Sequence, residues 1–339
     1  MKTRNKITIL APLAANEIGG TQNYVQELTK VFSEYGYSVS IIYFTYYKKY
    51  PTGIRHIAYF LSILFRGWNS KAFLALDSFS VAFPAKCVSI ITGVPMLVRI
   101  GGDFLYEEYL ERTREEVPLK FFYEKHKYKF TLKEQCIKYV QAWVCQGSHV
   151  IWNSIFLKTI WHKAYTLQSK KEFIIENPHQ GIVEDINNES NPTIFLASAR
   201  PHFVKNINRV VRAWESLGSK TNGYILKTGM MTPQEYQNAL RSARVVIVAS
   251  YTDIAPNTIL QARALGLPCI LTKENGLNEA IQKECLLVDP LSEQSIVDAL
   301  ALLLEEGSYQ KYKQKNTKEN IARSWEDYGK QYCNIIASL

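Results

Sequence analysis

The feature that most constrains the fold of this chain is a regular alternation of short apolar runs with longer stretches that have apolar residues at helical spacing. Short apolar runs without a polar face are typical of strands that are buried on both sides. Strands that alternate with helices build βαβ units, in which successive strands lie parallel. We therefore expect an α/β protein with parallel sheets.

The alternation runs in two series. In the first half we expect strands over 7–10, 38–44, 72–77, 95–100 and 142–150, and helices over 21–35, 54–65, 81–92 and 155–164. In the second half we expect strands over 193–197, 224–227, 244–249, 268–271 and 285–288, and helices over 206–217, 232–242, 257–265, 277–282 and 292–306. A domain boundary is indicated by the polar segment 166–171 and by the polar, acidic segment 183–191. We place this boundary between residues 170 and 171. Two such series predict two doubly wound sheets that face a cleft.

The composition is consistent with two domains, and the charge indicates which classes of binding partner are favoured. The chain has 339 residues, of which 47% are hydrophobic, enough for two ordinary cores. Its 40 basic and 31 acidic residues favour anionic partners, namely nucleotides, phospholipid headgroups or nucleic acid, without choosing among them. The six cysteines form no C-x-x-C pair, so we expect reduced core residues of a cytoplasmic protein.

The N-terminus admits two interpretations. Lys2, Arg4 and Lys6 precede an apolar run over 7–15, which is compatible with the start of a signal peptide. Pro12 breaks this run and a long amphipathic helix follows, so we favour a first buried strand. No apolar run reaches the ~18 residues that span a bilayer.

Two loops of the first half contain paired glycines. Gly19 and Gly20 either let the backbone approach a phosphate or a sugar, or simply provide a loop with positive φ. Gly101 and Gly102 precede Asp103 at the carboxyl end of an expected strand. We expect these glycines to clear space around Asp103, whose carboxylate either orients a hydroxyl in catalysis or caps the next helix.

Basic and aromatic residues interleave over 117–139, and again over 46–50. Three interpretations stay open: a solvated helix face with a buried aromatic stripe, docking on an anionic membrane, and binding of nucleic acid. The first two are favoured over the third.

The stretch 250–268 is the strongest candidate for a binding site. It follows the apolar run 245–249, and its pattern predicts a loop, a short helix and a turn before the next strand. Asp253 and the helix beginning at Asn257 and Thr258 would therefore lie at the carboxyl end of a buried strand, where ligands of open α/β sheets bind. A helix N-terminus favours an anion such as a diphosphate.

A second loop supplies cations for the same sheet edge. Arg200 and Lys205 follow the first strand of the second series. Fixed cations stabilise the charge that develops on a departing diphosphate. Ordinary surface charge is the alternative, but the 250–268 stretch at the same edge favours the functional interpretation.

These residues carry a family pattern. The chain resembles the retaining glycosyltransferases of family 4, the glycosyl transferases group 1, which have the fold called GT-B, with two Rossmann-like domains. The matching positions run through the chain in order: Gly19-Gly20, Asn153-Ser154, Asn177, Arg200, Lys205-Asn206, Asp253 to Gln261, Ala262, Gly266, Pro268, Gly276, Glu279 and Ser324-Trp325. The resemblance implies that the C-terminal helix over 323–339 crosses back to the first domain, 1–170, and that 171–322 binds the donor. It also implies that Arg200 and Lys205 hold a donor diphosphate and that Asp253 contacts the transferred sugar.

The sequence departs from the family pattern at three places. Gln261 stands where the family has a glutamate that contacts the ribose, which removes a charge-assisted hydrogen bond of ~1–2 kcal/mol at most. Gly101-Gly102-Asp103 stands where many members have a histidine. Only residues 218–223 separate the first helix and second strand of the second domain, which indicates a domain trimmed by one strand-helix unit.

The resulting expectation is a cytoplasmic, metal-independent hexosyltransferase without a cofactor, working in bacterial cell-surface polysaccharide or glycolipid synthesis. It would move a sugar from a nucleotide-diphosphate donor to a glycan or lipid-linked acceptor with retention, at an anionic membrane surface. Asp103, Arg200, Lys205 and Asp253 are the expected catalytic residues, and the expected donor-binding residues are Gly19, Gly20, Asn257, Thr258 and Gln261. The main alternative is a non-catalytic scaffold or sugar-nucleotide-binding subunit of a polysaccharide-assembly complex; a sugar transferase acting on nucleic acid is the least favoured.

Overall fold

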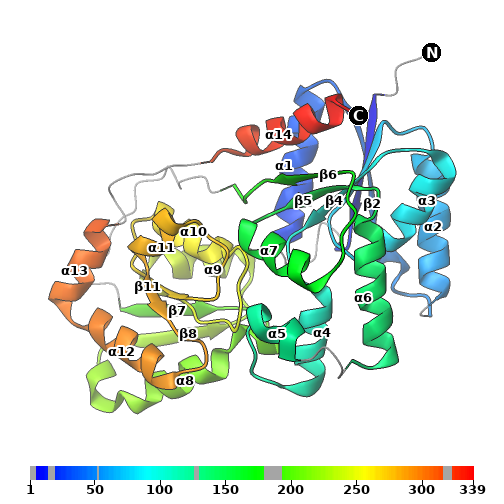
Figure 1. Cartoon of the computed structure of the whole chain (residues 1–339). Coiled ribbons are helices and arrows are strands. Elements are labelled where there is room, and N and C mark those ends of the chain that lie inside the picture. The colour runs from blue at the N-terminus through cyan, green and yellow to red at the C-terminus, as the bar shows by residue number, and fades with distance from the viewer. Residues whose placement is uncertain (1–4, 14–19, 52, 126–129, 179–192, 316–322) are drawn as a thin grey trace. The chain divides into compact units, whose positions relative to one another are not determined.

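Within the residues that the computed structural model describes, 5–13, 20–51, 53–125, 130–178, 193–315 and 323–339, the chain divides into two units (Figure 1). The first unit comprises Met1–Leu105, Lys127–Asn177 and Ser324–Leu339. The second comprises Tyr106–His126 and Pro178–Arg323. Each unit is built on one sheet whose described strands pair in parallel.

The first sheet has six strands in the order β2-β1-β3-β4-β5-β6. The strands are β1 (Lys6–Ala11), β2 (Ser38–Tyr43), β3 (Ala72–Ala75), β4 (Met96–Ile100), β5 (His149–Trp152) and β6 (Lys171–Ile174). The connecting helices are α1 (Gly20–Glu34), α2 (Ile54–Gly67), α3 (Ala82–Thr92), α4 (Phe104–Thr113), α5 (Leu119–Lys125), α6 (Leu132–Cys145) and α7 (Ile155–Ala164). Strand order reverses between β1 and β3, which is the doubly wound topology.

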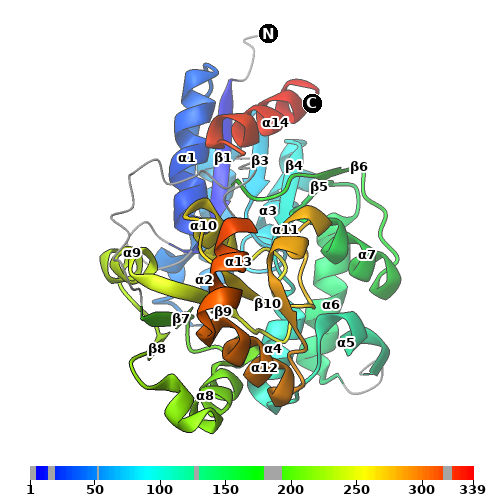
Figure 2. The ribbon, with the colours of Figure 1, turned by 90° about the vertical axis from the view of Figure 1, so that its left-hand side faces the viewer.

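Alternate residues of β3 face the two sides of this sheet. Leu74 packs in one core with α1 and α14 (Trp325–Ala337). Phe73 faces α2, where a Cβ on Gly67 would lie 2.7 Å from its ring. Figure 2 shows α14 beside α1, and a Cβ on Gly329 of α14 would come within 2.4 Å of Val31. The C-terminal helix therefore completes the core of the first unit.

The second sheet has five strands in the order β11-β10-β9-β7-β8, again doubly wound. They are β7 (Ile194–Ser198), β8 (Ile225–Gly229), β9 (Ala243–Val248), β10 (Cys269–Thr272) and β11 (Leu286–Val288). One core contains α8 (Ile207–Ser216) and α12 (Glu293–Leu304), and a separate one contains α9 (Pro233–Arg241) and α10 (Asn257–Ala264). Helices α11 (Glu279–Glu284) and α13 (Glu306–Lys315) complete this unit. All five strands lie where the sequence predicts them.

The division between the units differs from the expected boundary at 170/171. β6 pairs with β5 and so belongs to the first sheet, which moves the division to a point after Asn177. Residues 106–126 belong to the second unit although they fall within the first sequence series. The expected strand over 142–150 is also too long, because residues 142–145 continue helix α6, which starts at the capping box of Thr131 and Glu134.

The basic and aromatic stretch over 117–139 buries three of its aromatic residues, while Phe121 and Tyr139 are exposed. Phe122, Tyr123 and Phe130 are buried, and Phe122 contacts the rings of Tyr106 and Tyr109. These contacts favour the buried aromatic stripe among the three interpretations of this stretch. None of the helices in the described part of the chain combines the length and the hydropathy that a membrane-spanning segment needs.

Candidate functional site

The centre of the candidate site is an ion pair between the two loops that the sequence singled out. Lys205, in the short helix Phe203–Lys205 after β7, donates from Nζ to Oδ2 of Asp253, in the loop after β9, at 2.8 Å. Burial disfavours the ammonium, but the carboxylate of Asp253 outweighs this effect, so the pKa of Lys205 is raised above its usual value. Both strands end at the reversal of strand order, where α/β sheets bind ligands.

Asp253 is itself held in place. Its Oδ2 atom also accepts a hydrogen bond from Ser250 Oγ at 3.3 Å, and its backbone N–H donates to the Glu274 carbonyl at 3.0 Å. Asp253 forms an isolated parallel bridge with Asn275, after β10. Because Lys205 and Ser250 both use Oδ2, the other carboxylate oxygen is left for a further donor.

Arg200 lies near Lys205, close enough that its charge acts to lower the pKa of the Lys205 ammonium. The Arg200 side chain is exposed and forms no ion pair with any residue that the structure describes. The loop therefore presents one cation paired with an acid and a second cation open to solvent. This is the arrangement expected of a site for an anion with more than one charge.

The conformation of this loop depends on Asn206. Its φ of 57° is in the left-handed region, which asparagine tolerates better than most residues. Its buried amide donates to the carbonyls of Ala249 and Pro290, at 3.0 and 2.9 Å. Asn206 thus anchors the loop that contains Lys205 to the end of β9.

Helix α10 begins close in sequence to Asp253, at Asn257 and Thr258, and no side chain caps its N-terminus. Further along this helix, Gln261 accepts a hydrogen bond at Oε1 from the Tyr236 hydroxyl, at 2.7 Å. Burial raises the pKa of Tyr236 to about 12, so the hydroxyl stays protonated and donates at neutral pH. The acceptor side of the Gln261 amide is therefore occupied within the protein, and its NH₂ group is the side left for a ligand.

Segment 106–126 contacts helix α8 and the loop that ends in Asp253, and the sequence does not predict these contacts. Glu116 accepts hydrogen bonds from the Tyr251 hydroxyl, at 2.8 Å, and from Arg209. Burial disfavours the Glu116 carboxylate, but these two donors outweigh it and lower the pKa of Glu116. The backbone N–H of Leu119 donates to Thr252 Oγ1 at 2.9 Å. These contacts fix the loop that ends in Asp253, and no local sequence pattern announces them.

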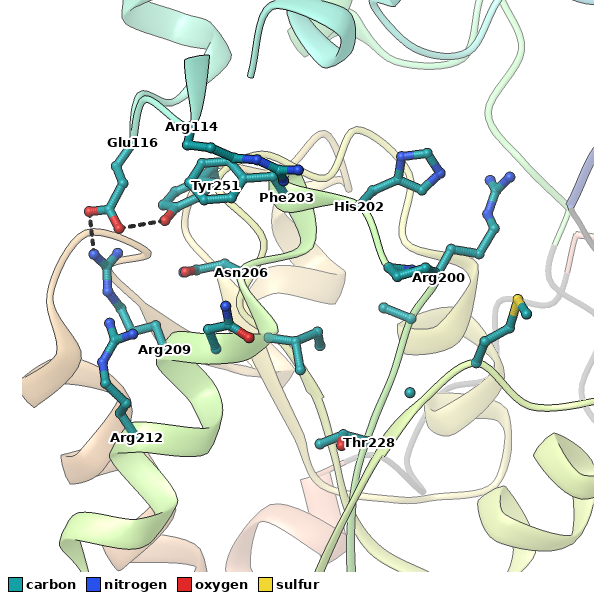
Figure 3. A pocket seen from close by; sticks show the side chains of 16 residues that line it. Arg114, Glu116, Arg200, His202, Phe203, Asn206, Arg209, Arg212, Thr228 and Tyr251 are labelled. Atoms are coloured by element: carbon teal, nitrogen blue, oxygen red, sulfur yellow. Dashed lines mark hydrogen bonds and ion pairs between the residues drawn. The ribbon is translucent and has the colours of Figure 1, made fainter. Parts of the chain in front are cut away.

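A cavity of about 400 Å³ adjoins the Arg200 loop (Figure 3). Arg114, Arg200, Arg209 and Arg212 line it, with Glu116 as the acid. Figure 3 shows Arg209 and Arg212 together on one side of the cavity, where Arg209 reaches Glu116, and His202 and Arg200 on the other side. Arg114, Arg209 and Arg212 are paired with Glu111, Glu116 and Glu293 respectively, so Arg200 is the cation of the lining that is open to an anion.

The other predicted site residues, Asp103, Gly19 and Gly20, belong to the first unit. Asp103 is buried, between β4 and α4. Gly20 begins α1, and Gly19 lies outside the described residues. A Cβ on Gly101 would lie 2.6 Å from Arg99 Nη1, so this glycine makes room for Arg99 rather than for Asp103. Arg99 itself binds Tyr328 and Asn177, at 3.0 and 2.7 Å, and stacks over Tyr24.

A buried carboxyl that the sequence did not indicate lies next to Asp253. Glu274 is buried, and its carbonyl accepts the Asp253 N–H. Burial raises the pKa of Glu274, with Lys120 and Lys273 acting in the opposite direction. Its position after β10 offers no spacing signal that would separate it from an ordinary loop residue.

Comparison with known proteins agrees with this geometry. Residues 192–306 match the family model of glycosyl transferases group 1. This range contains Arg200, Lys205, Asp253 and Gln261, and the match confirms the resemblance at the level of this group. Membership of family 4 stays a prediction.

Curated relatives match about a third of the chain. A sucrose-phosphate synthase of Spinacia oleracea is 32% identical over 109 residues, 31% of this chain and 10% of the relative. A D-inositol 3-phosphate glycosyltransferase of Corynebacterium urealyticum is 32% identical over 110 residues, 32% of this chain and 26% of the relative. The chain thus matches about a tenth of the length of the plant synthases.

Solved structures match over the whole chain. A sucrose-phosphate synthase from Thermosynechococcus elongatus has a TM-score of 0.70 at 14% identity, covering 99% of this chain and 100% of that one. WaaG, a glycosyltransferase involved in lipopolysaccharide biosynthesis, has a TM-score of 0.68 at 11% identity, covering 98% of this chain and 100% of that one. These likenesses show the fold, two Rossmann-like units of the GT-B class, as the sequence predicts.

Proposed function

We propose that this protein is a retaining glycosyltransferase that moves a sugar from a nucleotide-diphosphate donor to an acceptor hydroxyl. The observation that carries the proposal is the cluster of Arg200, Lys205 and Asp253 at the end of β7 and β9, where the Lys205–Asp253 distance is 2.8 Å. Two cations and one acid at this edge fit a ligand with an anionic part and a hydroxylated part.

Arg200 and Lys205 hold the diphosphate in this mechanism. The bond between the sugar's anomeric carbon and the phosphate oxygen breaks, and its electron pair stays on the diphosphate. Fixed cations stabilise this developing charge more strongly than mobile water does. The N-terminus of α10, at Asn257 and Thr258, places the positive end of the helix dipole toward a phosphate or sugar oxygen.

Asp253 and Gln261 orient the rest of the donor. Asp253 accepts from a sugar hydroxyl through the carboxylate oxygen that Lys205 and Ser250 do not use. The Gln261 NH₂ group donates to a ribose hydroxyl oxygen, because its Oε1 is bound by Tyr236. Gly19 and Gly20 are proposed to let the backbone approach the donor.

Retention follows if the acceptor attacks from the face that the diphosphate leaves. The acceptor oxygen bonds to the anomeric carbon, and its proton passes to the departing phosphate oxygen. Asp103 is proposed to position the acceptor or to stabilise positive charge on the sugar ring. We propose that neither a metal nor a cofactor takes part, since Arg200 and Lys205 supply the positive charge; activity that survives a chelator would support this.

The ligands bound by a protein of similar fold support the choice of donor. HepE from Anabaena, similar over 99% of this chain with a TM-score of 0.67 and 12% identity, was crystallised with UDP and glucose. We propose a hexose donor on such a nucleotide, and a glycan or lipid-linked acceptor of bacterial cell-surface polysaccharide or glycolipid synthesis. A cytoplasmic location agrees with the six cysteines, which are all free.

A second candidate function is a non-catalytic sugar-nucleotide-binding subunit of a polysaccharide-assembly complex. The observation that favours it is Gln261, which replaces the family's glutamate and is committed to Tyr236. Both candidates predict donor binding, and they differ in turnover.

A panel of nucleotide sugars in a thermal-shift assay tests the shared part, because a ligand that binds only the folded state raises the unfolding temperature. The binding donor is then incubated with candidate acceptors, and with water alone to detect hydrolysis. Loss of turnover in Arg200→Ala, but not in Arg241→Ala, which changes an exposed arginine of α9 outside the cavity lining, is the expected result. Binding without transfer or hydrolysis favours the scaffold, and no binding by any nucleotide sugar refutes both.

A further inference from the structure

Helix α2 of the first unit exposes a continuous apolar face. Ile54, Ile57, Leu61 and Phe65 are 55%, 61%, 42% and 72% exposed, and Trp68 after the helix is 58% exposed. Their spacing of three or four residues puts them on one side of the helix. The opposite side is also apolar and buried: Tyr59 and Ile63 are inaccessible, and the Tyr59 hydroxyl donates to the Ile42 carbonyl at 3.0 Å.

The exposed side of α2 is apolar, whereas the exposed side of a surface helix in water is normally polar. Such helices bury an apolar stripe and expose polar residues. Among the exposed residues of α2, only Arg66 is polar. Helix α3 lies beside α2 (Figure 1) and adds the exposed side chains of Ile90 and Ile91, at 63% and 64%. A large exposed apolar surface of this kind marks an interaction site.

The segment of the chain that contains α2 has basic residues and no acidic ones. Between Glu34 and Asp77 the sequence has no acidic residue, and it has five basic ones, Lys48, Lys49, Arg55, Arg66 and Lys71. Lys48, Lys49 and Arg66 are exposed. Asp77 accepts hydrogen bonds from the backbone N–H groups of Phe79, Val81 and Ala82, so its carboxylate is engaged at the start of α3.

We propose that the α2 face docks on an anionic lipid bilayer. Its apolar side chains would enter the interface between headgroups and acyl chains, while the lysines and arginine contact lipid phosphates. Tyr46, Tyr50 and Trp68, which are 60%, 40% and 58% exposed, supply the aromatic residues that favour this interface.

The positive charge of this face makes a second copy of the chain a less favourable partner than an anionic bilayer. In a twofold dimer the same patch meets itself, so Lys48, Lys49 and Arg66 of both copies would approach one another. Like charges that face each other across an interface are unfavourable. An anionic bilayer meets both the apolar and the basic part of this face.

The inference concerns a surface of the first unit and does not depend on glycosyl transfer. It gives a physical reason for a lipid-linked acceptor, since docking would bring the protein to the membrane. It also moves the expected membrane contact from 117–139, where Phe122, Tyr123 and Phe130 are buried, to α2 and the 46–50 segment before it.

The test is co-sedimentation of the full chain with vesicles, without any nucleotide. We expect binding to vesicles of phosphatidylcholine with phosphatidylglycerol, weak binding to phosphatidylcholine alone, and weaker binding at high salt. The double variant Ile57→Gln/Phe65→Gln should bind about tenfold or more weakly, because it removes two large apolar side chains from the docking face. The control Ile155→Gln/Ile225→Gln changes residues that are 57% and 60% exposed elsewhere and should bind like the wild type.

A second variant keeps the test informative if the glutamine pair unfolds. Lys48→Gln/Lys49→Gln alters only exposed charges and should remove most of the preference for phosphatidylglycerol. Equal binding to both vesicle types, equal loss in the control variant, or a wild-type dimer that Ile57→Gln/Phe65→Gln dissociates would overturn the proposal. A failure of donor binding or transfer leaves these vesicle results unaffected, so the two proposals fail separately.

Discussion

Replacing Lys205 with alanine should reduce both stability and turnover, by separate routes. The Lys205–Asp253 pair is 2.8 Å long, and its side chains are 31% and 14% exposed, so it is neither a surface pair nor a fully buried one. Exposed pairs contribute ~0–1 kcal/mol, whereas breaking a buried pair costs ~3–5 kcal/mol because it leaves an uncompensated charge. We therefore expect Lys205→Ala to lower the free energy of unfolding by about 1–3 kcal/mol.

The effect on turnover has a different origin. Removing one fixed group that stabilises developing negative charge costs about 10²–10³ in kcat. If Lys205 holds the departing diphosphate, kcat falls by this factor in the variant that still folds. Lys205→Arg, which keeps the charge, should recover part of the loss in kcat.

Two measurements separate these routes. Urea unfolding gives the stability of Lys205→Ala, Asp253→Asn and the double variant, and steady-state kinetics on the folded proteins gives kcat and KM. The double variant should be more stable than Lys205→Ala alone, because it no longer buries an unpaired carboxylate. A Lys205→Ala protein with wild-type stability and a kcat within about threefold of the wild type would refute the reasoning, since an effect on phosphate charge alone is worth more.

Three further outcomes follow from the site. Gln261→Glu keeps an acceptor for the Tyr236 hydroxyl and replaces the NH₂ donor with a charged acceptor, to which the same ribose hydroxyl can donate, so donor KM should fall by up to about tenfold; a raised KM in donor titrations would show that this hydroxyl has to accept from an NH₂ group. Glu116 has a lowered pKa, so its stabilisation is present above ~4.3, the ordinary pKa, and is lost below it; the stability difference between wild type and Glu116→Gln should shrink in urea unfolding as pH falls through this range. Asp103→Asn, which preserves shape, should lower kcat by ~10²-fold or more if Asp103 acts on the acceptor or the sugar ring; equal kcat with reduced stability would leave it a structural residue.

The strands and the loops that follow them could be predicted because their signals are local. β7, β9 and β10 are short apolar runs bounded by turn residues, a pattern typical of buried parallel strands. The same pattern locates Arg200, Lys205 and Asp253, since side chains that follow neighbouring parallel strands gather at one sheet edge. The positions of these residues directly after the strands were therefore enough to predict that they lie close together.

The contacts that escaped prediction depend on side chains far apart in sequence. Glu116 reaches Tyr251 and Arg209, and no periodicity within 106–126 distinguishes this segment from the unit that precedes it. β6 was missed as a strand of the first sheet because its residues are only partly buried and include Lys171 and Glu172. Residues 142–145 were expected in a strand because an apolar run inside a helix looks the same over four residues.

The geometry of Asp253 also decides which substitution is informative there. Lys205 and Ser250 both donate to Oδ2, so that oxygen is needed by the protein and the other one is available to a sugar hydroxyl. In Asp253→Asn, the amide oxygen must face Lys205, because an NH₂ group there would oppose the ammonium. The NH₂ group then faces the sugar and offers a donor where the carboxylate offered an acceptor. Donor binding should therefore weaken even though the loop keeps its hydrogen bond to Lys205, and Ser250→Ala, which removes only a 3.3 Å contact to Oδ2, should weaken it much less.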